Sequence, residues 1–105
     1  MAVGGEKGSV IKVTVRTILD LKRLIGSERV TLPLERGSTL GDLVRALIEE
    51  FGQGLASRIV DESTGKPYPY LRFVVNGRDI AFLQAFDTVL NEGDEILIIP
   101  PVGGG

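Results

Sequence analysis

The reactive group that this sequence offers is the carboxylate of its last residue, Gly105. The chain closes on two prolines, a valine and three glycines, residues 100–105. Because glycine has no Cβ, a glycine arm fits a narrow channel with its backbone close to a partner's backbone. Proline restricts the base of the arm, and from Pro100 to Gly105 it spans up to ~20 Å when extended. The order of residue types therefore predicts a carboxylate that is presented to another protein.

Other reactive side chains are scarce, because the 105 residues contain neither cysteine nor histidine. A chain without cysteine forms no disulfide, thiolate metal site or persulfide, and a chain without histidine lacks the commonest general base. The adjacent carboxylates Glu49 and Glu50 do not face one another on a helix, so we interpret them as a solvated face. We therefore expect no metal site, no bound cofactor and no self-contained enzyme.

Length and charge indicate one domain without a nucleic-acid or membrane surface. The chain is 43% hydrophobic and 25% charged, with a net charge of −2. Acidic and basic residues are interleaved, so the sequence has no basic stripe that could bind nucleic acid. It also has no apolar run long enough to span a bilayer. We expect a cytoplasmic protein with a flexible leader at residues 1–8, a folded domain at 9–101 and a flexible glycine tail at 102–105.

The elements that must position the tail begin with a predicted hairpin. Apolar and polar residues alternate over 10–17 and again over 29–34, which predicts two paired strands. Pro33 indicates an exposed edge position or a strand end, since proline cannot donate to the ladder. The intervening residues 17–25 predict a short apolar connection or a turn of helix.

A core helix is predicted over residues 40–51. Apolar residues recur there at helical spacing, Ser38 or Thr39 can cap the start, and Gly52 suits the residue after the last turn. The pattern is weak from Leu55 to Tyr70, apart from a predicted turn at 62–65.

The second half of the chain predicts further strands. Residues 71–75 are strand-like and lead into Asn76-Gly77, a dipeptide suited to a tight hairpin turn, with a return over 78–80. An irregular segment at 81–90 and a turn at 91–94 precede a last strand at 96–99. A hairpin, a crossing helix and more strands indicate a two-layer α+β fold.

The ending of the chain resembles the MoaD group of the MoaD/ThiS ubiquitin-like sulfur carriers. That group shows a Gly-Asp turn, an apolar strand, two prolines, a small apolar residue and a terminal Gly-Gly, as residues 93–105 do here. The segment Val75–Ile80, followed by Phe82-Leu83 and Asp87-Thr88, is also similar. The resemblance covers residues 9–105 and implies a ubiquitin-like β-grasp with one mixed sheet packed on one main helix. Gly103 departs from the group, which often has serine or alanine there, and residues 55–70 look longer than in its shortest members.

The resemblance also implies a function for the tail. An E1-like enzyme would adenylate Gly105 with ATP, and a sulfur donor protein would convert it to a thiocarboxylate. Gly104-Gly105 would then enter the large subunit of molybdopterin synthase and deliver sulfur to the molybdenum or tungsten pterin cofactor, with this chain as the non-catalytic small subunit. The residues expected to contact partners are Leu97, Ile99, Pro100, Pro101, Val102, Gly103 and Phe82.

The last strand adds a docking hypothesis, because Ile96-Leu97-Ile98-Ile99 is apolar on both faces. The resemblance places Ile96 and Ile98 inward and Leu97 and Ile99 outward, where an apolar patch favours docking. Alternatively, the loop carrying Phe82, Leu83 and Phe86 covers this patch.

Other functions stay open at the sequence level. The same tail could serve thiamin synthesis or tRNA thiolation, or be conjugated to lysines as a ubiquitin-like modifier. A plain β-grasp binding module with an idle tail is the third class.

Overall fold

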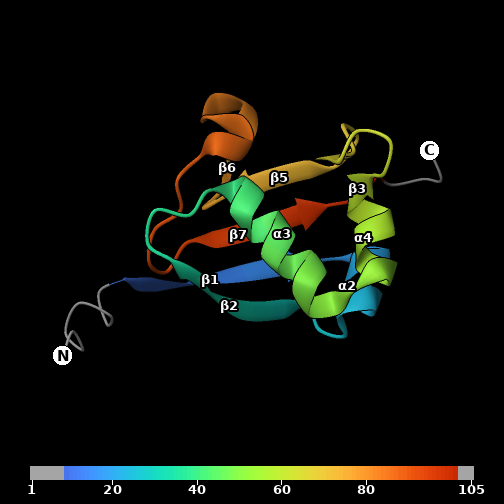
Figure 1. Ribbon diagram of the computed structural model, residues 1–105, viewed down its shortest axis with the longest axis horizontal. Coiled ribbons are helices and arrows are strands. Elements are labelled where there is room, and N and C mark those ends of the chain that lie inside the picture. The colour runs from blue at the N-terminus through green and yellow to red at the C-terminus, as the bar shows by residue number, and fades with distance from the viewer. Residues whose placement is uncertain (1–8, 102–105) are drawn as a thin grey trace.

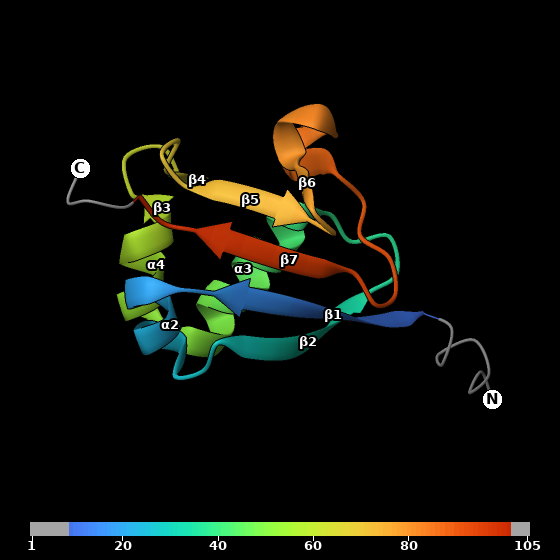
Figure 2. The ribbon, with the colours of Figure 1, turned by 180° about the vertical axis from the view of Figure 1, so that it is seen from behind.

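The computed structural model describes residues 9–101, which form a mixed sheet with helices on one of its faces (Figures 1 and 2). The sheet order is β2-β1-β7-β5-β6. The main elements are β1 (Val10–Thr17), α2 (Leu19–Ile25), β2 (Arg29–Glu35), α3 (Leu40–Phe51), α4 (Gln53–Ile59), β3 (Val60–Asp61), β4 (Lys66–Pro67), β5 (Arg72–Val75), β6 (Arg78–Asp79), the 3-10 helices η1 (Ile80–Phe82) and η2 (Ala85–Asp87), and β7 (Glu95–Ile99).

The last strand of the chain lies in the middle of this sheet. β7 pairs in parallel with β1 and antiparallel with β5, while β1 and β2 form the predicted antiparallel hairpin. β2 is an edge strand, which confirms the position inferred from Pro33. The sheet is therefore mixed, as the resemblance implies.

The main helix, α3, begins at a capping box, and of the two candidate caps, Ser38 and Thr39, the structure uses Thr39. The Thr39 hydroxyl accepts a hydrogen bond from the backbone N–H of Asp42, and the Asp42 carboxylate accepts one from the backbone N–H of Thr39. Two backbone donors that helix geometry leaves unpaired are thereby satisfied. Gly52 follows the last turn at a φ of 85°, a backbone conformation that glycine adopts without strain.

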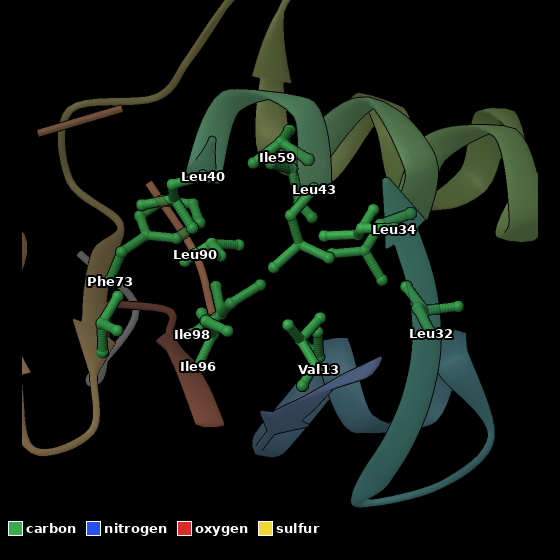
Figure 3. Close-up of a cluster of buried hydrophobic side chains, with 14 of the residues drawn as sticks. Val13, Leu32, Leu34, Leu40, Leu43, Ile59, Phe73, Leu90, Ile96 and Ile98 are labelled. Carbon is green, nitrogen blue, oxygen red and sulfur yellow. The ribbon is translucent and has the colours of Figure 1, made fainter. Parts of the chain in front are cut away.

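The core lies between α3 and the sheet (Figure 3). Alternate residues of β7, Ile96 and Ile98, are fully buried, and Phe73 of β5 and Val13 of β1 are buried beside them. From the helix layer, Leu40 and Leu43 reach the same cluster (Figure 3). The inward placement of Ile96 and Ile98 agrees with the expectation from sequence.

The segment with the weakest sequence pattern holds a helix that the pattern did not predict. In α4, Leu55 and Ile59 are almost completely buried, so two well-placed apolar residues anchor a helix of seven. The turn predicted at 62–65 is confirmed, since it joins the short strands β3 and β4. The connection predicted at 17–25 contains the helix α2, which packs against α4, and α4 in turn packs against the main helix.

Candidate functional site

The base of the tail, Pro100 and Pro101, follows β7, a strand that is paired on both of its sides. Ile98 is paired with Thr17 of β1 and Phe73 of β5, and Ile99 is paired with Arg72. Pro100 follows as a buried residue and Pro101 as an exposed one. Because proline has no N–H to donate, the ladder ends where the two prolines begin. β7 thus ends in the middle of the sheet, and Pro100 and Pro101 follow it there.

The predicted reactive residues follow directly but lie outside the described residues. These are Val102, Gly103, Gly104 and Gly105. The structure therefore shows the point from which the arm starts and the surfaces around that point.

The outer side of β7 contributes to the face of the sheet opposite the helices, which we call the open face (Figure 2). Leu97 and Ile99 are partly exposed on it, in agreement with the expected alternation. The register sets Val74 and Arg16 on either side of Leu97. Val74, Leu97 and Ile99 are therefore apolar neighbours on the open face, with Arg16 and Arg72 directly beside them.

Charged side chains lie around Val74, Leu97 and Ile99 on the open face, and they form ion pairs with one another. The Glu95 carboxylate accepts a hydrogen bond from Arg29 at 2.8 Å and lies 3.7 Å from Arg16. Arg72 donates to Asp79 at 3.1 Å. The pKa of Asp79 is lowered, chiefly because the backbone N–H of Ala81 donates to its carboxylate and secondarily because Arg72 does. Asp79 is thus ionised at neutral pH.

Phe82 lies apart from the other predicted contact residues. It ends η1, which follows β6, whereas the tail base is at the start of β5, where Arg72 pairs with Ile99. Its side chain is 82% exposed, the largest value among the exposed large apolar residues of the described chain. The structure brings together Leu97, Ile99, Pro100 and Pro101, whereas Phe82 follows β6, at the other end of β5 from the Arg72–Ile99 pair.

The loop of Phe82, Leu83 and Phe86 does not cover the open face. The ring of Phe86 packs edge-on against the buried ring of Phe73, with centroids 5.1 Å apart. Phe73 points to the helix side together with its partner Ile98. The loop thus packs on the core side, which leaves Leu97 and Ile99 accessible.

Two further observations concern residues 9–101. They contain no group of three or more acidic side chains placed to hold a metal ion. None of their helices combines the length and apolar content needed to cross a membrane.

Comparison with known proteins gives consistent matches. Residues 19–105 match the model of the ThiS family. The chain is 28% identical over 95 residues to small archaeal modifier protein 3 of Haloferax volcanii, covering 90% of this chain and 100% of that protein. It is 33% identical over 70 residues to the sulfur carrier protein CysO of Mycobacterium tuberculosis, covering 66% of this chain and 74% of CysO.

A solved structure confirms the fold. The crystal structure of SAMP1 from Haloferax volcanii superposes with a TM-score of 0.79 at 28% identity, over 90% of this chain and 99% of SAMP1. The mixed sheet with its crossing helix is accordingly a ubiquitin-like β-grasp.

Proposed function

The chain belongs to the ThiS family, within the ubiquitin-like sulfur carriers, and from this premise we propose that its Gly105 carboxylate is converted to a thiocarboxylate that supplies sulfur for molybdopterin synthesis. The observation that carries the proposal is the exit of the chain at Pro101, straight from a central strand held on both sides. A rigid base and a bare glycine arm suit a carboxylate that must enter another protein's active site.

The chemistry proceeds in two balanced steps. The Gly105 carboxylate attacks the α-phosphorus of ATP, so that pyrophosphate leaves and an acyl adenylate forms. Hydrosulfide delivered by a sulfur donor protein then displaces AMP, which gives the thiocarboxylate and releases one proton. Neither step needs a side chain of this protein, which fits a chain without cysteine or histidine. ATP is used by the activating enzyme and is not held by the carrier.

Three partners follow from these steps: an E1-like adenylating enzyme, the sulfur donor and the large subunit of molybdopterin synthase. We assign docking to the open face, where Leu97 and Ile99 offer apolar area next to the tail. Arg16, Arg29 and Arg72 lie at the edge of that area together with their partners Glu95 and Asp79, which leaves one more basic than acidic side chain there, so a partner with some acidic residues at its margin suits it. We place these encounters in the cytoplasm.

The test is the intact mass of the full chain after incubation with ATP, a sulfide source and the purified E1-like enzyme of the source organism. We expect a fraction of the protein to gain the mass difference between sulfur and oxygen, and a variant lacking Gly104-Gly105 to show no such gain. If the truncated variant is modified to the same extent, the proposal is wrong.

A second candidate function is conjugation to lysines, because one similar protein bears the name small archaeal modifier protein 3. Activation would be shared, and the Gly105 acyl group would then pass to a lysine amine, either from the adenylate with release of AMP or from a thioester on an enzyme with release of its thiol. Immunoblots from the source organism distinguish the two: a modifier appears as larger, Gly104-Gly105-dependent conjugates, whereas a carrier stays at its own mass.

A further inference from the structure

The sheet has a long unpaired edge, and β2 forms it. β2 has seven residues and stands at one end of the strand order, whereas β6 at the other end has two. Within residues 9–101 β2 pairs only with β1, and Figure 2 shows no other element along its outer side. An edge of this kind presents backbone N–H and C=O groups with which another chain can pair. The groups that point outward decide whether a second strand can add there.

Two hydrogen bonds at the ends of the hairpin fix the direction of the backbone groups in β2. The N–H of Thr17 donates to the carbonyl of Glu28 at one end. The N–H of Arg36 donates to the carbonyl of Ser9 at the other. In an antiparallel pair such bonds recur at every second residue, so the residues of β2 that bond to β1 are Val30, Leu32 and Leu34. The residues whose N–H and C=O groups point to the open edge are therefore Arg29, Thr31, Pro33 and Glu35.

Pro33 removes a donor from the middle of this edge. The side chain of Pro33 is exposed, and its ring stands where another residue would carry an N–H. The pairing of β2 with β1 loses nothing by this, because residue 33 is one of those that point away from β1. The proline thus costs the hairpin no hydrogen bond and takes one only from a strand that would add outside.

Both ends of the edge are already bonded within the chain. The Ser27 hydroxyl donates to the carbonyl of Arg29 at 2.8 Å and accepts from the N–H of Arg29 at 3.2 Å. The carbonyl of Glu35 accepts from the N–H of Ser38 at 3.0 Å. On this edge of the described chain, the groups left for another strand are the N–H and C=O of Thr31, the C=O of Pro33 and the N–H of Glu35.

A second copy of this chain matches the edge in charge. When two β2 strands are set antiparallel with Thr31 opposite Pro33 of the other copy, Arg29 stands opposite Glu35 and Glu35 opposite Arg29. Opposite charges across two strands are stabilising, whereas a parallel arrangement in register would set like charges side by side. The side chain of Arg29 is 56% exposed and bonded to Glu95, so it borders this edge with a defined position.

The same arrangement shows what the proline prevents. Thr31 and residue 33 of the other copy would exchange both N–H···O bonds of an antiparallel pair. Pro33 has no N–H, so one of the two bonds is missing at each of the two equivalent places. The charges favour the pairing, and the backbone at its centre opposes it.

We propose that the edge of β2 is complementary to the same edge of a second copy of this chain, and that Pro33 blocks this pairing and keeps the chain monomeric. The bonds made by Ser27 and Ser38 add to the block, because they occupy outward groups of Arg29 and Glu35. The proposal goes beyond the proposed function and does not depend on it, since no step involves Gly105.

The experiment compares the unchanged chain with Pro33→Thr by sedimentation equilibrium over a series of protein concentrations. Threonine restores the N–H and favours a strand. The unchanged chain is expected to keep the mass of one chain, whereas Pro33→Thr is expected to approach twice that mass as the concentration rises. Thermal melting checks that each variant is folded, and Pro33→Val replaces the threonine variant if that one does not fold.

Hydrogen exchange tests the direction of the backbone groups in the unchanged chain. The amide of Thr31 points outward and is expected to exchange at least about tenfold faster than the amide of Leu32, which bonds to β1. In Pro33→Thr the exchange of the Thr31 amide is expected to slow as the protein concentration rises.

The matched control moves the proline by two residues and leaves the composition unchanged. Thr31→Pro combined with Pro33→Thr again lacks one outward N–H and keeps every bond to β1, so it is expected to stay a single chain. A second variant tests the register: Glu35→Arg added to Pro33→Thr sets like charges across the pair and is expected to weaken the association about tenfold.

Four results would overturn the proposal. The first is a folded Pro33→Thr that keeps the mass of one chain. The second is association of the variant with the moved proline as strong as that of Pro33→Thr, since the missing N–H would then not matter. The third is an unchanged chain that is already dimeric with a slowly exchanging Thr31 amide. The fourth is association that Glu35→Arg does not weaken, or that continues beyond two copies, since another surface would then be responsible.

Discussion

Thr17 is a buried polar side chain at a structurally demanding place. It ends β1, is only 1% exposed, and its Oγ1 has no hydrogen-bond partner within the described residues. Its backbone N–H donates to the carbonyl of Glu28, whereas its hydroxyl has no such partner. A buried hydroxyl without a partner costs free energy, because it has given up its bonds to water.

Replacing this hydroxyl by a methyl group tests that cost. Thr17→Val is expected to raise the free energy of unfolding by about 1 kcal/mol, because it removes an unsatisfied group and keeps the side-chain shape. Urea unfolding followed by circular dichroism measures the change. Thr14→Val is the control: its Oγ1 lies 3.3 Å from that of Thr31, so the free energy should stay equal or fall. A loss of stability in Thr17→Val would show that the hydroxyl is satisfied, for example by water.

At the scale of an element, the start of α3 depends on the charge of Asp42. The pKa of Asp42 lies below its ordinary value of 3.8, chiefly because the backbone N–H of Thr39 donates to it and further because of Arg45. A carboxyl with a lowered pKa in the folded state contributes stability above its unfolded pKa. That contribution is lost as the pH falls below 3.8 through the folded value.

The pH dependence is testable in Asp42→Asn. This side chain cannot ionise, so the melting temperature of the variant is expected to fall less steeply than that of the unchanged chain as the pH drops from 5 towards 2. Thermal unfolding at a series of pH values provides the measurement. Glu50→Gln, which alters an exposed carboxylate of the same helix, is expected to change the slope less. Equal slopes in all three proteins would remove Asp42 from the acid response.

At the scale of the whole molecule, the last strand completes the sheet. β7 separates β1 from β5, and its Ile96 and Ile98 are both fully buried. The strands β1 and β2 are therefore not paired with β5 and β6 until the chain is nearly complete. The strand that carries the tail is also the strand that closes the core.

This arrangement predicts a sharp difference between two truncations. A chain ending at Asp94 lacks β7 and is expected to show no cooperative thermal transition, because β1 and β5 lose their shared partner and the core loses two isoleucines. A chain lacking only Gly104-Gly105 is expected to melt as the full chain does. Circular dichroism on heating measures both. Cooperative melting of the chain ending at Asp94 would show that β7 is not required for the fold.

Local chemistry in the sequence was enough to predict several elements. The alternation in residues 10–17, the helical spacing in 40–51 and the Asn76-Gly77 turn all correspond to observed elements. Asn76 and Gly77 both have the positive φ values that such a turn requires. The lack of cysteine and histidine and the order of residues 100–105 likewise needed no structure to be recognised.

Tertiary contacts decided the rest, because they depend on residues far apart in the chain. Leu55 and Ile59 form a helix where local periodicity is weak, since the core supplies the surface that buries them. The separation of Phe82 from Pro100 follows from antiparallel pairing of β5 with β7, and the position of α2 beside Pro100 and Pro101 follows from parallel pairing of β1 with β7. The sequence by itself determined which group can react, whereas long-range strand pairing determined which surfaces stand around it.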